Sequence, residues 1–198
     1  MLLAVTKDEI GPPDAVLAHL RAVTKPAHDR LEGALGLLDP QLDLTTYSKV
    51  IERLYGFWRG WEPLVGALLQ DEAFLRPRRR LHRLEADLAA LGLSAHAVQG
   101  LPACPVPMLR DGVEALGSLY VMEGSTLGGR VIQRNVERSL GQNGLSAWAY
   151  FAGYGAQTGA MWRSFVERLN EAPLTDAERI ANGAVATFER LGWWLTRP

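Results

Sequence analysis

The sequence predicts an all-α protein in which about seven or eight helices pack around one shared core. Apolar residues recur at helical spacing along most of the chain, and no segment shows the period-two alternation with turn signals that marks a strand. The chain has 198 residues, of which 47% are hydrophobic and 22% are charged, as is usual for a globular protein. We expect residues 1–13 to be a loose lead-in and residues 14–198 to form a single domain.

The first helix is predicted directly after a Gly-Pro-Pro run. Asp14 can cap it, and its apolar stripe continues as far as Leu31. Pro26 lies inside this stripe, where it removes a backbone donor and crowds the preceding turn. We therefore expect a kink or a restart between Thr24 and His28.

Three further helices are predicted in the middle of the chain, over residues 45–58, 64–69 and about 79–91. Pro63 separates the first two of them. The third begins within a cluster of basic residues that we expect to be solvated, namely Arg76, Arg78, Arg79, Arg80 and Arg83. Residues 100–108 contain three prolines and are predicted to be an extended connection.

The longest periodic segment runs from about residue 111 to residue 140 and ends at Gly141. Shorter helices fit residues 146–150, 155–171 and 175–195. The predicted architecture is thus a helical bundle built without internal repeats.

Residues 119–132, with the sequence LYVMEGSTLGGRVI, place several glycines inside this long helix. A glycine in a helix interior costs about 1 kcal/mol relative to alanine, so another interaction must offset the loss. Helical spacing brings five residues onto one stripe, namely Gly117, Tyr120, Gly124, Gly128 and Val131. A face with so few side chains allows another helix or a planar ligand to lie against the backbone.

His28 is the one histidine of four that lies squarely on an apolar stripe. Such a residue is either a hydrogen-bonded core histidine or a metal ligand. Glu32 follows one turn later, where its carboxylate can accept from the second ring nitrogen of a ligating imidazole. No other His or Cys stands at the spacing of a protein-only metal site. A single histidine ligand implies a metal that brings its own equatorial ligands, as the iron of haem does.

Charge and cysteine content exclude several classes of function. The net charge is −1 and the chain has no long basic run, which argues against nucleic acid as the main partner, with the arginine cluster at residues 76–83 as the one exception. One cysteine cannot form a disulfide within the chain, which favours a reducing compartment, and we expect a cytoplasmic protein. The apolar run MLLAV at the start is too short for a signal peptide or a membrane span.

Two segments resemble the haem oxygenases, in particular the small bacterial members: LRAVTKPAHDRLE at residues 20–32 and LYVMEGSTLGGRVIQR at residues 119–134. The resemblance extends to YGF at residues 55–57, RLEADLAALG at residues 83–92 and GYGAQTGAMWRSF at residues 153–165. It implies a single-domain bundle that holds haem between a proximal helix and a kinked distal helix.

The resemblance assigns the iron-facing residues. His28 matches the proximal iron ligand, and Glu32 matches its hydrogen-bonding partner. The glycines of the distal helix, which lie over the haem face, match Gly124, Gly128 and Gly129.

Further positions match residues around the rim of the haem and near bound oxygen. Arg21 matches a basic residue that pairs with a haem propionate, Tyr120 matches its usual distal-helix neighbour at the same edge, and Arg163 matches another propionate-binding arginine. Ser125 stands where larger members carry an Asp that organises water near the bound oxygen. A hydroxyl can both donate and accept, so the resemblance still implies an active enzyme.

The implied reaction is the oxidative cleavage of haem b, which is both substrate and cofactor, to biliverdin, carbon monoxide and iron. It uses O2 and an external electron donor, such as a reductase or a ferredoxin. The distal glycines would steer an iron-bound hydroperoxide to a meso carbon, and Arg21 with Tyr120 resembles the arrangement that gives the α isomer. The sequence leaves open whether the biliverdin passes to an acceptor, such as a bacterial phytochrome, or whether the reaction serves to release iron.

Three alternatives remain open. The chain could bind haem or a bilin as a carrier without turnover, since Ser125 replaces an Asp. It could be a thiaminase-like helical enzyme without haem, for which Cys104 among three prolines is a poor nucleophile. Gly124 and Gly128, four residues apart, could also form a close contact between two helices.

Overall fold

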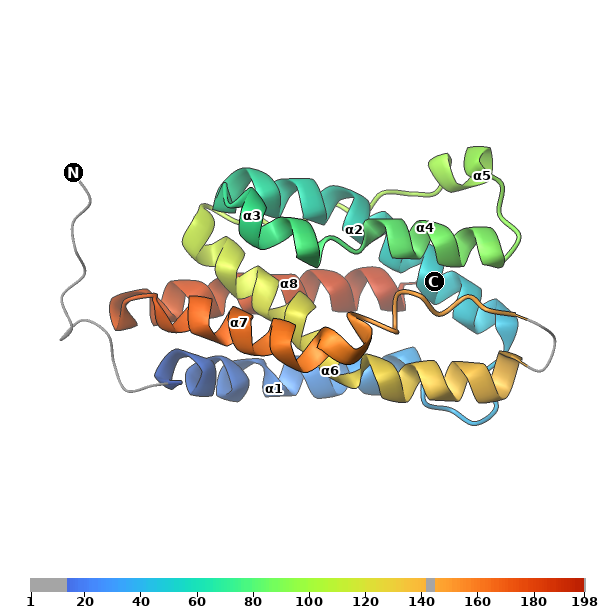
Figure 1. Ribbon diagram of the computed structural model, residues 1–198, viewed down its shortest axis with the longest axis horizontal. Helices are drawn as coiled ribbons and strands as arrows, with labels where there is room; N and C mark the ends of the chain where they lie inside the picture. Colours follow the sequence, from blue (N-terminus) through green and yellow to red (C-terminus); the bar gives the residue numbers. More distant parts are fainter. Residues whose placement is uncertain (1–13, 142–144, 198) are drawn as a thin grey trace.

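The computed structural model describes residues 14–141 and 145–197, and every regular element in these ranges is a helix (Figure 1). The predicted lead-in, residues 1–13, lies outside the described residues. The helices are α1 (Ala15–Leu35), α2 (Leu44–Leu69), α3 (Glu72–Leu75), α4 (Leu81–Ala90), α5 (Ala95–Gln99), α6 (Gly112–Leu140), α7 (Thr158–Asn170) and α8 (Ala177–Thr196). Short 3-10 turns occupy Arg76–Arg78, Gly155–Gln157 and Leu174–Asp176. The predicted all-α fold is confirmed.

Both internal prolines are accommodated within continuous helices. α1 runs through Pro26, so of the predicted kink or restart the helix does not restart there; α2 runs through Pro63, so the predicted break in α2 is wrong. A proline removes only one backbone donor, and near Pro63 the burial of Trp61 and Val65 compensates for that loss. Leu20 of α1 is completely buried, and Trp61 of α2 is 3% exposed.

Carboxylates cap the starts of α2 and α6, but not the start of α1, for which a cap was predicted at Asp14. Asp43 accepts from the backbone N–H of Thr46 at 2.8 Å at the start of α2, and Asp111 caps α6. Asp14 has a left-handed backbone with φ of 67° and makes no capping bond, so that prediction is wrong. Its carboxylate instead accepts from Asn170 of α7 at 3.2 Å.

α8 lies at the centre of the bundle and packs against both α6 and α1 (Figure 1). The contact with α6 is a backbone-to-backbone approach. A Cβ atom on Gly117 would overlap the carbonyl oxygen of Ile180, and a Cβ atom on Gly183 would overlap that of Glu114. For Gly117, the interpretation as a close helix contact is therefore correct.

The segment predicted as a helix over residues 146–150 is instead irregular and ends in a turn. The reason is the buried carboxylate of Asp87 on α4. Its two oxygens accept from the backbone N–H groups of Ala149 at 2.6 Å and Tyr150 at 2.9 Å. These bonds hold the segment against the bundle, where it covers part of α6. Within the described residues, no helix is both long and apolar enough to cross a bilayer.

Candidate functional site

A cavity of about 610 Å³ lies between α1 and α6, with further walls from α8 and the segment around Phe151. α6 changes direction along its length, so that its second half runs beside α1 (Figure 1). Eight residues predicted for the site line this cavity, namely Arg21, His28, Glu32, Tyr120, Gly124, Ser125, Gly128 and Gly129. Arg163 is an exposed residue of α7 outside the lining, and the structure does not bring it to the others.

His28 presents one ring nitrogen to two carboxylates. Its Nδ1 atom lies 3.5 Å from Oδ1 of Asp29 and 3.8 Å from Oε2 of Glu32. The imidazole side chain is 59% exposed, and its ring meets the edge of Phe188 with 6.1 Å between the centroids. Because Nδ1 faces the carboxylates, Nε2 is the nitrogen available to a metal.

Asp29 is an anion beside this imidazole. Its Oδ2 accepts from Nζ of Lys25 at 2.7 Å, and this hydrogen bond lowers the pKa of the Asp29 carboxyl below its ordinary value. The same bond raises the pKa of Lys25. The negative charge next to Nδ1 is therefore retained at neutral pH.

The glycines of α6 have three different surroundings. The position of a Cβ atom on Gly128 is open, with no described heavy atom within 4 Å. On Gly124 a Cβ atom would make an ordinary contact of 3.8 Å with Trp162. On Gly129 it would lie 2.5 Å from the carbonyl oxygen of Phe151. Gly124 and Gly128 thus leave space over the cavity, whereas Gly129 allows a backbone segment to approach α6.

The two ends of the cavity differ in polarity. α1 and α6 run in the same general direction (Figure 1), so residues early in both helices share one end. That end carries Arg21, Lys25, Tyr120 and Trp162, and the rings of Tyr120 and Trp162 lie 6.1 Å apart. The opposite end is apolar and is lined by Leu35, Leu38, Leu127 and Val131. A flat molecule with acidic groups on one edge and hydrocarbon on the other would match this division.

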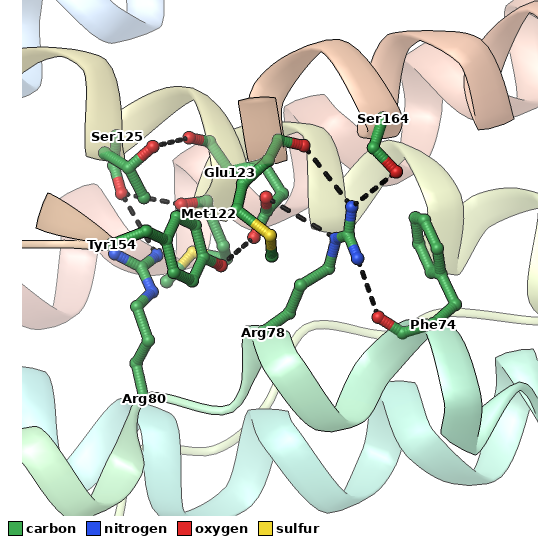
Figure 2. A network of polar contacts seen from close by, with 10 residues as sticks. Phe74, Arg78, Arg80, Met122, Glu123, Ser125, Tyr154 and Ser164 are labelled. Atoms are coloured by element: carbon green, nitrogen blue, oxygen red, sulfur yellow. Dashed lines mark hydrogen bonds and ion pairs between the residues drawn. The ribbon is translucent and has the colours of Figure 1, made fainter. Parts of the chain in front are cut away.

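Arg80 is a cavity residue that sequence reasoning missed. It is 1% exposed, and its Nη2 donates to the carbonyl oxygen of Met122 at 2.5 Å and to Oγ of Ser125 at 3.5 Å (Figure 2). Its guanidinium stacks on the rings of Trp58 and Tyr150, at 4.8 Å and 5.1 Å from their centroids. The hydroxyl of Ser125 donates to the same carbonyl at 2.8 Å.

Arg78 is also buried, so the expectation of a solvated arginine cluster is wrong for two of its members. The Nε of Arg78 lies 3.6 Å from Oε2 of Glu123, and its Nη1 donates to the carbonyl of Phe74 at 2.8 Å (Figure 2). The 3-10 turn at Arg76–Arg78 separates these arginines from α4 and allows their side chains to turn inward. Pro77 inside the cluster is the sequence signal for that turn.

Glu123 joins this buried network on the side of α6 away from the cavity. Its Oε1 accepts from the hydroxyl of Tyr154 at 2.5 Å (Figure 2). Burial raises the pKa of the Glu123 carboxyl, against the hydrogen bond from Tyr154 and the charges of Arg80 and Arg78, which lower it. The network connects α6 to the turn before α4 and to the segment after Phe151, so it fixes the wall opposite His28.

The donor set fits a metal that arrives with its own ligands. Among the described residues, no group of three His, Cys, Asp or Glu side chains is arranged to hold an ion. One imidazole faces a slot whose opposite wall offers open space at Gly128. This combination suits an iron porphyrin, in which four nitrogens already surround the metal.

Comparison with known proteins identifies the family that the sequence resembles. The family model described as Heme oxygenase matches residues 14–197. The chain is 33% identical over 158 residues to a heme oxygenase of Xanthomonas campestris, covering 74% of this chain and 87% of that protein. It is 31% identical over 188 residues to the heme oxygenase PigA of Pseudomonas aeruginosa, covering 90% of each.

Solved structures share the fold. Heme oxygenase-1 from the cyanobacterium Synechocystis, solved in complex with heme, superposes with a TM-score of 0.72 at 15% identity, covering 91% of this chain and 90% of that one. Heme oxygenase from Leptospira interrogans superposes with a TM-score of 0.74 at 13% identity, covering 92% of this chain and 98% of that one. The match of the family model over nearly the whole chain, together with relatives above 30% identity, shows that this chain belongs to the haem oxygenase family.

Proposed function

We propose that the chain binds haem b in the cavity and cleaves it to biliverdin, carbon monoxide and iron. The observation that carries the proposal is the pairing of His28, with Nδ1 turned to two carboxylates, and the open backbone of Gly128 across the same cavity. Two relatives that match most of the chain are named heme oxygenase. The bound haem supplies the iron that activates O2, and electrons come from an external donor.

His28 holds the iron through Nε2. A thiolate ligand donates electron density strongly and favours early cleavage of the O–O bond. A neutral imidazole is a weaker donor and does not favour it. The Oε2 atom of Glu32 lies 3.8 Å from Nδ1, from where a small movement would let it accept a hydrogen bond from that nitrogen and fix the tautomer and the orientation of the ring.

Gly124 and Gly128 limit the space on the other face of the ring. Backbone without side chains would permit close approach of α6 to a bound haem, and so would limit the directions open to a small ligand on that face. Ser125 lines the cavity beside the buried cation Arg80. Its hydroxyl can hold a water that delivers a proton without a strong acid above the iron.

The polar end of the cavity orients the haem. Arg21 and Tyr120 bind a propionate there. Gly129, farther along α6, allows the segment at Phe151 to approach the helix. The apolar end receives the hydrocarbon edge. This orientation brings one meso carbon to the reacting oxygen, and we propose the α carbon on the resemblance of Arg21 and Tyr120 to residues of α-cleaving members.

A non-catalytic carrier of haem or bilin is the alternative that Ser125 keeps open. The test is to load the purified protein with hemin and to add ascorbate or a ferredoxin reducing system. An enzyme loses the Soret band while biliverdin absorbance appears, and chromatography identifies the isomer. A carrier retains the Soret band and yields no biliverdin.

The proposed reaction also needs an electron donor, a fate for its product and a cellular location. A reductase or a ferredoxin supplies the electrons, and the product passes to a bilin acceptor such as a bacterial phytochrome or is discarded after iron release. The single cysteine, Cys104, is consistent with the reducing cytoplasm that we propose as the location. Purification of the chain with its bound partners from a soluble extract tests these assignments.

A further inference from the structure

We propose that Asp29 is a second carboxylate acceptor for His28, and that Lys25 controls its availability. The proposal rests on the proposed function of His28 as iron ligand and adds two positioning residues to it. Binding of the acidic edge of the substrate by Lys25 would thereby change how strongly His28 donates electrons to the iron.

The geometry singles out Asp29. Its Oδ1 lies 3.5 Å from Nδ1 of His28, which is closer than the 3.8 Å to Oε2 of Glu32. Neighbouring residues on a helix do not ordinarily face each other, whereas residues four apart do. Asp29 nevertheless turns toward the imidazole while its other oxygen, Oδ2, bonds Lys25 at 2.7 Å. One carboxylate thus bridges a cation and the imidazole.

Lys25 is the group that can release this carboxylate. It lines the polar end of the cavity one turn after Arg21, where the acidic edge of haem is expected. A substrate carboxylate that takes the Lys25 ammonium competes directly with Asp29 for it. Asp29 then loses its cation, and its charge becomes available to the Nδ1 proton of His28.

The consequence lies at the iron. An acceptor at Nδ1 increases the basicity of Nε2, and a more fully charged acceptor does so more strongly. With two carboxylates within 4 Å of the same nitrogen, removing one leaves the other in place. The effect of each acceptor is therefore partial, and the loss of both exceeds the loss of either.

Resonance Raman spectroscopy of the ferrous haem complex tests the proposal, because the iron–histidine stretching band moves to higher wavenumber as Nδ1 becomes more strongly hydrogen-bonded. Asp29→Asn and Glu32→Gln should each lower the band, and the double variant should lower it further. In the complex with haem b a substrate carboxylate already occupies Lys25, so Lys25→Met should leave the band unchanged. In the complex with haem dimethyl ester, which has no free carboxylate, Lys25→Met should raise the band, because Asp29 is then free to bond His28. Glu85→Gln, which removes an exposed acid on α4, is the matched control and should leave the band unchanged.

Other outcomes overturn the proposal. A band in Asp29→Asn identical to that of the wild type would show that Glu32 alone supports His28. An unchanged or lowered band in the dimethyl ester complex of Lys25→Met would show that Lys25 does not control Asp29. If the wild-type complex has no iron–histidine band at all, the proposed function fails and the role of Asp29 fails with it. All four substituted residues lie on exposed helix surfaces, and thermal unfolding followed by circular dichroism confirms that each variant is folded.

Discussion

The buried guanidinium of Arg80 lies 3.5 Å from the hydroxyl oxygen of Ser125 and shares with it the carbonyl oxygen of Met122 as an acceptor. In an undisturbed helix such a carbonyl accepts only the N–H four residues later. Side-chain donors at a helix carbonyl favour bending, and α6 changes direction along its length (Figure 1). Arg80 therefore supports the shape of α6 as well as placing positive charge beside the cavity.

Substitution of Arg80 should destabilise the protein and impair turnover. In Arg80→Met the charge of Glu123 loses a cation and the Met122 carbonyl loses a donor, for which we expect about 1–3 kcal/mol of lost stability. Biliverdin formation should fall while hemin still binds through His28. Urea unfolding and single-turnover spectra measure the two effects. Ser125→Ala is the control that removes only the hydroxyl, and a loss of stability as large as that in Arg80→Met would contradict the role of Arg80.

Gly128 and Gly129 should respond in opposite ways to a side chain. Gly128→Ala places a methyl group in open space and should stabilise the protein by about 1 kcal/mol, while Gly128→Leu should block the cavity and abolish hemin binding. Gly129→Ala should destabilise it, because the new Cβ would lie 2.5 Å from the Phe151 carbonyl oxygen. Thermal unfolding and hemin titration give both quantities. Full hemin binding by Gly128→Leu would show that α6 does not cover the haem.

Arg21 should control which meso carbon is cleaved. It lines the polar end of the cavity, so in Arg21→Ala one propionate loses its cation and the haem can bind in more than one rotation. We expect a mixture of biliverdin isomers, separated by chromatography, where the wild type gives one. Arg163→Ala removes an arginine that does not line the cavity and should leave the isomer unchanged. A single unaltered isomer from Arg21→Ala would remove it from the anchoring residues.

Asp111 should make part of the stability sensitive to acid. Its pKa is lowered by the backbone N–H of Glu114 and by the charge of Arg179, so the carboxylate stabilises the fold above the ordinary value of 3.8. That contribution is lost as the pH falls through 3.8 and then through the lower pKa of the folded state. Asp111→Asn keeps a cap for α6 without the charge. Its free energy of unfolding, measured by urea unfolding from about pH 5 to about pH 2, should fall less steeply than that of the wild type. Parallel curves would contradict this.

The sequence was sufficient for the fold class and for α6, because long helical periodicity and a clear Asp111 cap are local signals. It was insufficient at Pro26, where the helix does not restart, and at Pro63, where burial of Trp61 and Val65 keeps the helix intact. It also failed for residues 146–150, since the Asp87 carboxylate that holds them lies about sixty residues earlier in the chain.

The residues of the candidate site were also only partly predictable from the sequence. His28, Glu32 and the glycines were visible as anomalies on helical stripes, and they line one cavity. Arg80 was hidden in a basic cluster, because the residue type alone does not distinguish a solvated arginine from one buried against Trp58 and Tyr150. The glycines on one stripe also have two different roles, which only the packing of the structure distinguishes. Gly117 contacts α8, whereas Gly128 faces the cavity.

Titration with hemin, followed by a reductant, tests the central claim most directly. The wild type should take up one equivalent with the spectrum of histidine-ligated haem and convert it to biliverdin. His28→Ala should lose that ligation and form no biliverdin, and added imidazole should restore the ligation. Failure of the wild type to bind hemin, or an unchanged biliverdin yield from His28→Ala, would contradict the assignment of the cavity.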